Sequence, residues 1–136
     1  MSPYMKRAHE LRAITEPHYN CAQSVTVSFA PVMGITEQQA YAMAANFGGG
    51  MKMGSVCGAL TGCLMVLGYC GLDDVGMLQN LYRGMRKRHE NAMNCVDLLR
   101  LNSEKGLPKK PHCDAMVYEF IEVTENLLRE HGVLPA

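Results

Sequence analysis

The stretch of residues 55–70 constrains the fold most, because it is apolar on nearly every side of a helix. Such a helix must be buried, so we expect it at the centre of the molecule, with Ser55 as its cap. Gly54, Gly58 and Gly62 recur every four residues along this segment. Each interior glycine destabilises a helix by roughly 1 kcal/mol relative to alanine. We therefore expect another backbone to approach closely here, from the same chain or from a second subunit.

The rest of the chain predicts further helices and no strands. Ser2 and Pro3 are typical of a helix start, and apolar residues at helical spacing follow to about residue 15. Thr36 and Gln39 form a capping-box pattern before a short helix that ends near residue 47. The other predicted helices span residues 17–29, 73–101 and 111–130. We expect one all-α domain over residues 1–136, a bundle of about six helices around the buried glycine-rich helix.

The charge balance disfavours several classes of partner. Thirteen basic residues match 13 acidic ones, so no positive field selects nucleic acid. No apolar run reaches membrane-spanning length, and the N-terminal residues lack the apolar core of a secretion signal. We predict a cytoplasmic protein without nucleic-acid binding or membrane insertion. The glycine spacing and 11 methionines favour a homodimer.

Six cysteines carry the main chemical signal of the sequence. A reducing compartment disfavours structural disulfides, which favours redox, catalytic or metal-binding roles. No two of them form C-x-x-C, which argues against a thioredoxin motif, a zinc ribbon and a c-type haem attachment. A shared site must therefore be assembled by the fold.

Three of these cysteines fall in the first turn of a predicted helix, namely Cys21, Cys57 and Cys113. Free backbone amides and the helix dipole stabilise a thiolate there, the form that attacks disulfides and binds metals. Cys63 and Cys70 lie seven residues apart on one stripe of the apolar helix, which indicates packing.

A triple glycine precedes Cys57 in the sequence. Gly48, Gly49 and Gly50 have no side chains, so the backbone can approach a ligand closely. Gly58 directly follows the cysteine. We predict that these four glycines contact whatever the cysteines bind.

Four segments of the chain form a longer pattern. Asn20-Cys21-Ala22-Gln23-Ser24 is followed by Cys57-Gly58-Ala59-Leu60-Thr61-Gly62, then by Cys95-Val96-Asp97 and by Cys113-Asp114-Ala115. In this order they resemble the redox-active family named for its C, GCAxxG, C, C cysteine pattern, over residues 20 to about 120. The resemblance implies that Cys21, Cys57, Cys95 and Cys113 are the functional set. The family is also similar to the cluster-carrying domain of split-Soret cytochromes, which implies an iron-sulfur or other metal site on the same cysteines.

Three functions follow from these features. In the first, a thiol-dependent oxidoreductase, Cys57 attacks an oxidised partner and Cys21 or Cys113 resolves the mixed disulfide. In the second, the thiolates of the four cysteines hold an iron-sulfur cluster or another metal that transfers electrons. In the third, a non-catalytic helical module dimerises or binds a partner, and replacement of Cys57 has no effect. The two cysteine-based functions are favoured, and the redox partner is left open.

Overall fold

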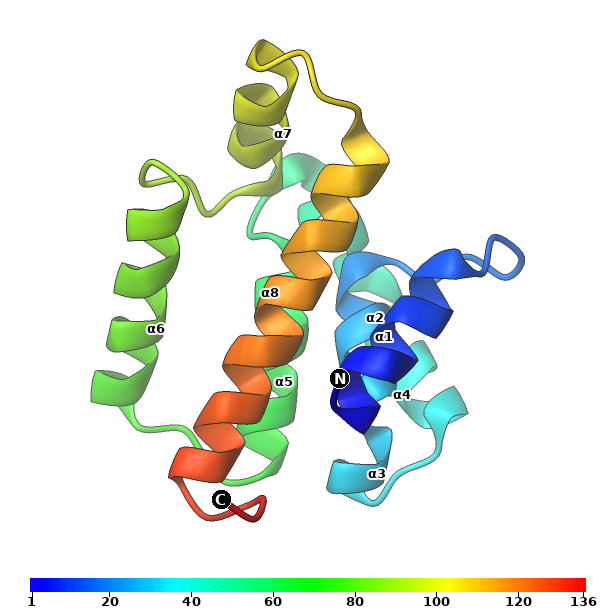
Figure 1. The fold of residues 1–136 in the computed structure, drawn as a ribbon, viewed down its shortest axis with the longest axis vertical. Helices are drawn as coiled ribbons and strands as arrows, with labels where there is room; N and C mark the ends of the chain where they lie inside the picture. Colours follow the sequence, from blue (N-terminus) through cyan, green and yellow to red (C-terminus); the bar gives the residue numbers. More distant parts are fainter.

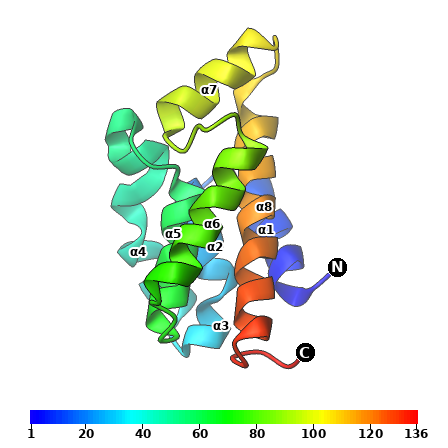
Figure 2. The same ribbon diagram turned by 90° about the vertical axis from the view of Figure 1, so that its left-hand side faces the viewer.

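The computed structural model describes all 136 residues and confirms the all-α prediction. Eight α-helices and two short helical turns make up the chain. They are α1 (Pro3–Ala13), α2 (Cys21–Ser28), α3 (Ala30–Met33), α4 (Glu37–Met43), η1 (Ala45–Phe47), η2 (Gly50–Gly54), α5 (Gly58–Tyr69), α6 (Val75–Arg88), α7 (Cys95–Glu104) and α8 (Lys109–Glu130). Figures 1 and 2 show α8 running along α5, with α7 across one end of the bundle. None of the helices is both long and apolar enough to cross a membrane.

Local capping signals place several helix starts correctly. The Ser2 side chain accepts a hydrogen bond from the Met5 amide at 3.1 Å, and Thr36 caps α4 as predicted. The predicted start of the second helix near residue 17 is wrong. Asn20 and Gln23 form a capping box that starts α2 four residues later, at Cys21.

The prediction of one helix across residues 73–101 is also wrong. Helix α6 ends at Arg88, and Glu90 and Asn91 then take left-handed backbone angles, with φ of 54° and 67°. Left-handed residues cannot continue a right-handed helix, so the chain turns and starts α7 at Cys95. The apolar spacing continues across this break, which is why the sequence pattern misses it.

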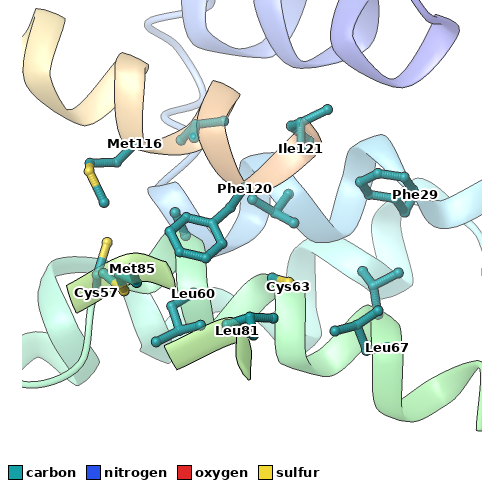
Figure 3. Packing of buried hydrophobic residues seen from close by; sticks show 14 of the residues in the cluster. Phe29, Cys57, Leu60, Cys63, Leu67, Leu81, Met85, Met116, Phe120 and Ile121 are labelled. Carbon is teal, nitrogen blue, oxygen red and sulfur yellow. The ribbon is translucent and has the colours of Figure 1, made fainter. Parts of the chain in front are cut away.

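The central burial of α5 agrees with the prediction. Its Leu60, Cys63 and Leu67 are almost fully buried. Figure 3 shows Phe120 of α8 extending over this row, with Phe29 at its far end. The core thus lies between α5 and α8, with α2 packed against both.

The glycines of α5 serve contacts within the chain. A Cβ at Gly62 would lie 2.8 Å from the Ala22 carbonyl oxygen, and one at Gly58 would lie 3.2 Å from the Ala22 amide nitrogen. Helix α2 is therefore the backbone that approaches α5. The same Cβ at Gly58 would lie 3.3 Å from the Cβ of Cys21. The close approach thus sets Cys21 beside the start of α5, next to Cys57.

Candidate functional site: a cavity lined by four cysteines

A cavity of about 700 Å³ lies at the end of the bundle that α7 covers. Its lining comes from the starts of α2, α5, α7 and α8, and from the loop around η2. Four of the six cysteines line it, namely Cys21, Cys57, Cys95 and Cys113. The fold therefore brings together all four predicted site cysteines.

Each cysteine is placed by the start of a helix. Cys21 and Cys95 are the first residues of α2 and α7, and Cys57 is the N-cap of α5. Cys113 lies about one turn into α8, because that helix starts at Lys109 rather than at Pro111. The sequence does not identify Cys95 as a helix start, because it predicts one continuous helix across residues 73–101.

Two backbone hydrogen bonds tie the start of α7 to the start of α5. The Cys95 amide donates to the Ser55 carbonyl oxygen at 2.6 Å, and the Cys57 amide donates to the Met93 carbonyl oxygen at 3.0 Å. They belong to an isolated antiparallel bridge. The prediction that Ser55 caps α5 is therefore wrong. Ser55 joins the two segments, and Cys57 holds the N-cap position without a side-chain hydrogen bond.

Cys113 is the thiol of the four whose pKa is lowered. A hydrogen bond from the Cys21 thiol lowers the pKa of Cys113 to about 7, against burial, which raises it. The positive charges of Lys109 and Arg12 lower it further, and the carboxylate of Asp114 opposes them. Cys21 keeps its proton, since the same hydrogen bond and then burial raise its pKa well above the usual value.

The other two cavity thiols are harder to ionise. Burial raises the pKa of Cys57 to about 11, although the amides of Ala59 and Leu60 stabilise its thiolate. Burial and then a charge on Cys113 raise the pKa of Cys95. A helix start thus favours a thiolate at Cys57, but desolvation outweighs it.

Cys63 and Cys70 lie outside the cavity. Cys63 is fully buried, which raises its pKa to about 12. Cys70 caps the C-terminus of α5, and burial raises its pKa too. Neither position offers access to the four other sulfurs.

Sequence reasoning missed the cationic groups of the cavity. Arg12 is buried, and its Nε donates to Asp114 at 2.7 Å while its Nη1 donates to the Tyr19 carbonyl oxygen at 2.8 Å. Lys110 donates to Asp114 at 3.1 Å, and Lys109 lines the cavity without an ion pair. The two lysines precede Cys113 closely enough to be noticed in the sequence. No local signal links Arg12 to this site.

The predicted glycines divide into two groups. Gly49 and Gly58 line the cavity, and Gly48 and Gly50 do not. A Cβ at Gly48 would lie 2.5 Å from the Cβ of Asn20, so this glycine serves chain packing. Contact between these glycines and a cofactor stays a prediction.

The loop after the triple glycine has an unusual backbone. Gly49, Gly50, Met51 and Lys52 all have left-handed angles, with φ between 56° and 64°. A Cβ at Gly50 would clash with the carbonyl oxygen of Ser55. Met51 and Lys52 have side chains that disfavour left-handed backbone angles, so contacts around the loop must hold it in this conformation.

The side chains do not form a site for a single metal ion as they are arranged. No three histidine, cysteine, aspartate or glutamate side chains lie close enough together to hold one metal ion. An iron-sulfur cluster is usually held by four thiolates. A single-ion site is therefore not favoured by this geometry, whereas an iron-sulfur cluster, whose thiolates bind different iron atoms, stays a prediction.

Comparison with known proteins gives one result. The model of the family described as "Putative redox-active protein (C_GCAxxG_C_C)" matches residues 19–127. This range contains all four cysteines of the cavity. No curated protein and no solved structure matches the chain.

Proposed function

The chain belongs to the redox-active protein family with the C_GCAxxG_C_C cysteine pattern, and from this we propose that it performs thiol–disulfide exchange through Cys113 and Cys21. One observation carries the proposal. Cys21 and Cys113 line the same cavity, and their interaction lowers the pKa of Cys113 to about 7. An attacking thiol is most effective when its pKa lies near the ambient pH. The attack therefore falls to Cys113 rather than to Cys57.

The reaction takes two steps. The Cys113 thiolate attacks one sulfur of a substrate disulfide, the S–S bond breaks, and one substrate thiolate leaves. Cys21 then passes its proton to the leaving group and attacks Cys113, which releases the second substrate thiolate. The substrate disulfide is reduced to two thiols, and the protein gains a Cys21–Cys113 disulfide. The reverse sequence oxidises thiols.

Cys57 and Cys95 belong to the proposed site as a second dithiol. Both line the same cavity, and a charge on Cys113 raises the pKa of each, so their sulfurs lie near it. The backbone bridge holds their two segments together. Exchange with the Cys21–Cys113 disulfide would move the oxidation to this pair and restore Cys113.

Trapping the mixed disulfide tests the proposal. The triple variant Cys21→Ser, Cys57→Ser and Cys95→Ser leaves Cys113 as the one cavity thiol, so the reduced variant should retain one substrate half on Cys113 after reaction with a disulfide. The wild-type protein should instead form a Cys21–Cys113 disulfide, mapped by mass spectrometry without reduction. Cys70→Ser is the matched control and should behave like wild type. An unmodified Cys113 in every case overturns the proposal.

Metal analysis distinguishes thiol–disulfide exchange from the metal-binding alternative. Anaerobically purified protein is assayed for iron and zinc, and the thiol proposal expects neither at stoichiometric amounts. Stoichiometric metal that is lost in Cys113→Ser and Cys57→Ser would overturn it in favour of the metal alternative.

We also propose a cytoplasmic location, because six free cysteines are typical of a reducing compartment. Homodimerisation stays a prediction. Gly58 and Gly62 are already used by α2 within the chain, so a dimer would need another surface. Light scattering of the purified protein measures this directly.

A further inference from the structure

Apart from the Cys113 thiolate, the charged side chains on the cavity wall are cationic. Arg12, Lys109 and Lys110 line it, and no aspartate or glutamate does. Asp114 is not among the lining residues, and it pairs with Arg12 and Lys110. One carboxylate thus offsets part of the charge of these three cations, and the cavity keeps a net positive contribution from them.

Arg12 has a donor left over. Its Nε and Nη1 are used by Asp114 and by the Tyr19 carbonyl oxygen, and Nη2 has no acceptor in the protein. The side chain is only 7% exposed, yet it lines the cavity. A buried guanidinium with a free N–H fits a carboxylate well, because the hydrogen bond is charge-assisted and fixed in direction.

Lys109 supplies a second free cation. Unlike Lys110, it forms no ion pair and no side-chain hydrogen bond. Its charge lowers the pKa of both Cys95 and Cys113, so it lies near both sulfurs. A ligand whose sulfur reaches Cys113 therefore comes within the field of Lys109.

The rest of the wall is apolar. Half of the lining residues are hydrophobic, among them Val96, Leu99 and Met116. The volume of about 700 Å³ falls in the range of small-molecule sites. The cavity thus suits a compact molecule with an apolar or sulfur-bearing middle and anionic ends.

From these features we infer that the substrate of this site is a low-molecular-mass disulfide with carboxylate groups, held by Arg12 Nη2 and Lys109 while its S–S bond meets Cys113. The inference rests on the proposed thiol–disulfide exchange. One carboxylate-bearing thiolate leaves in the first step, and its partner leaves as Cys21 resolves the mixed disulfide. The protein is oxidised, and each substrate molecule yields two carboxylate-bearing thiols.

Three matched disulfides test the charge preference. The reduced protein is oxidised by 3,3′-dithiodipropionate, by neutral 2-hydroxyethyl disulfide or by cationic cystamine, at one pH and low salt. The second-order rate constant, corrected for the rate with a free model thiol, should be about tenfold higher for the dianion than for cystamine. The ratio should fall as salt is added.

A variant links the preference to the cavity. Lys109→Gln should reduce the ratio of the dianion rate to the cystamine rate several-fold. A change in the ionisation of Cys113 affects all three disulfides alike and cancels in this ratio. Arg83→Gln, on the outer side of α6, is the matched control and should leave the ratio unchanged.

The outcomes separate the two proposals. Equal corrected rates, a preference for cystamine, or a ratio that Lys109→Gln does not alter would overturn the assigned substrate class, even if Cys113 is still oxidised. Failure of all three disulfides to modify Cys113 would overturn the thiol–disulfide function itself.

Discussion

The backbone amide of Cys95 donates a 2.6 Å hydrogen bond to the carbonyl oxygen of Ser55. This contact joins the start of α7 to the segment that leads into α5. It places Cys95 on the cavity that Cys57 also lines. The four-cysteine site therefore depends on a contact between two connecting segments as well as on helix packing.

The first prediction concerns the pH dependence of thiol alkylation. Cys113 has a pKa of about 7, lowered mainly by the Cys21 hydrogen bond. Below this pH its thiol is protonated and reacts slowly; above it the thiolate reacts fast. Its alkylation by iodoacetamide should therefore rise with a midpoint near pH 7. Cys57, with a pKa of about 11, should stay slow throughout.

Peptide mass spectrometry after timed alkylation gives the rate at each cysteine. Cys21→Ala tests the cause, because it removes the hydrogen-bond donor and should therefore move the alkylation midpoint of Cys113 to higher pH. A midpoint for Cys113 near that of an ordinary thiol in the wild-type protein would contradict the assignment.

The second prediction concerns Lys109. Its positive charge lowers the pKa of Cys113, so Lys109→Gln should move the alkylation midpoint of Cys113 to higher pH. Lys105→Gln is the control, because Lys105 is exposed near the same helix start and has no resolved effect on Cys113. An unchanged midpoint in Lys109→Gln would show that the lysine lies too far from the sulfur.

The third prediction concerns the close packing of α5 on α2. Gly62→Ala should lower the free energy of unfolding by about 1–3 kcal/mol, because the added Cβ would lie 2.8 Å from the Ala22 carbonyl oxygen. Gly68→Ala is the matched control in the same helix. No atom lies within 4 Å of its Cβ, so it should be neutral or stabilising by up to about 1 kcal/mol.

Urea unfolding followed by circular dichroism measures both variants. Equal stabilities for Gly62→Ala and Gly68→Ala would mean that α2 does not approach α5 as closely as described.

The fourth prediction concerns the turn between α6 and α7. Glu90 is exposed and has φ of 54°, a conformation that is unfavourable for residues with a Cβ. Glu90→Gly should therefore raise the free energy of unfolding by about 1 kcal/mol. Arg83→Gly, at an exposed position within α6, should lower it by about 1 kcal/mol.

The two glycine substitutions have opposite expected signs, so one urea series compares them directly. A loss of stability in Glu90→Gly as large as that in Arg83→Gly would indicate a helix that continues through residue 90.

Local chemistry allowed much of the fold to be predicted. The Ser2 and Thr36 caps, and the burial of α5, follow from neighbouring residues and from apolar spacing alone. The order of the cysteine segments also indicated the family and the four cysteines that line the cavity. These features depend on residues that are close together in the sequence, so they can be recognised without the tertiary structure.

Only the tertiary structure distinguishes these thiols by their pKa values. The sequence favours Cys57 because of its helix start, but burial raises its pKa, whereas the Cys21 hydrogen bond lowers the pKa of Cys113. Arg12, distant in sequence, completes the cavity through its contact with Asp114. Desolvation and charge–charge interactions depend on which groups the fold brings together. A helix start in the sequence therefore identifies candidate thiolates, and the surroundings in the folded cavity determine which of them has a lowered pKa.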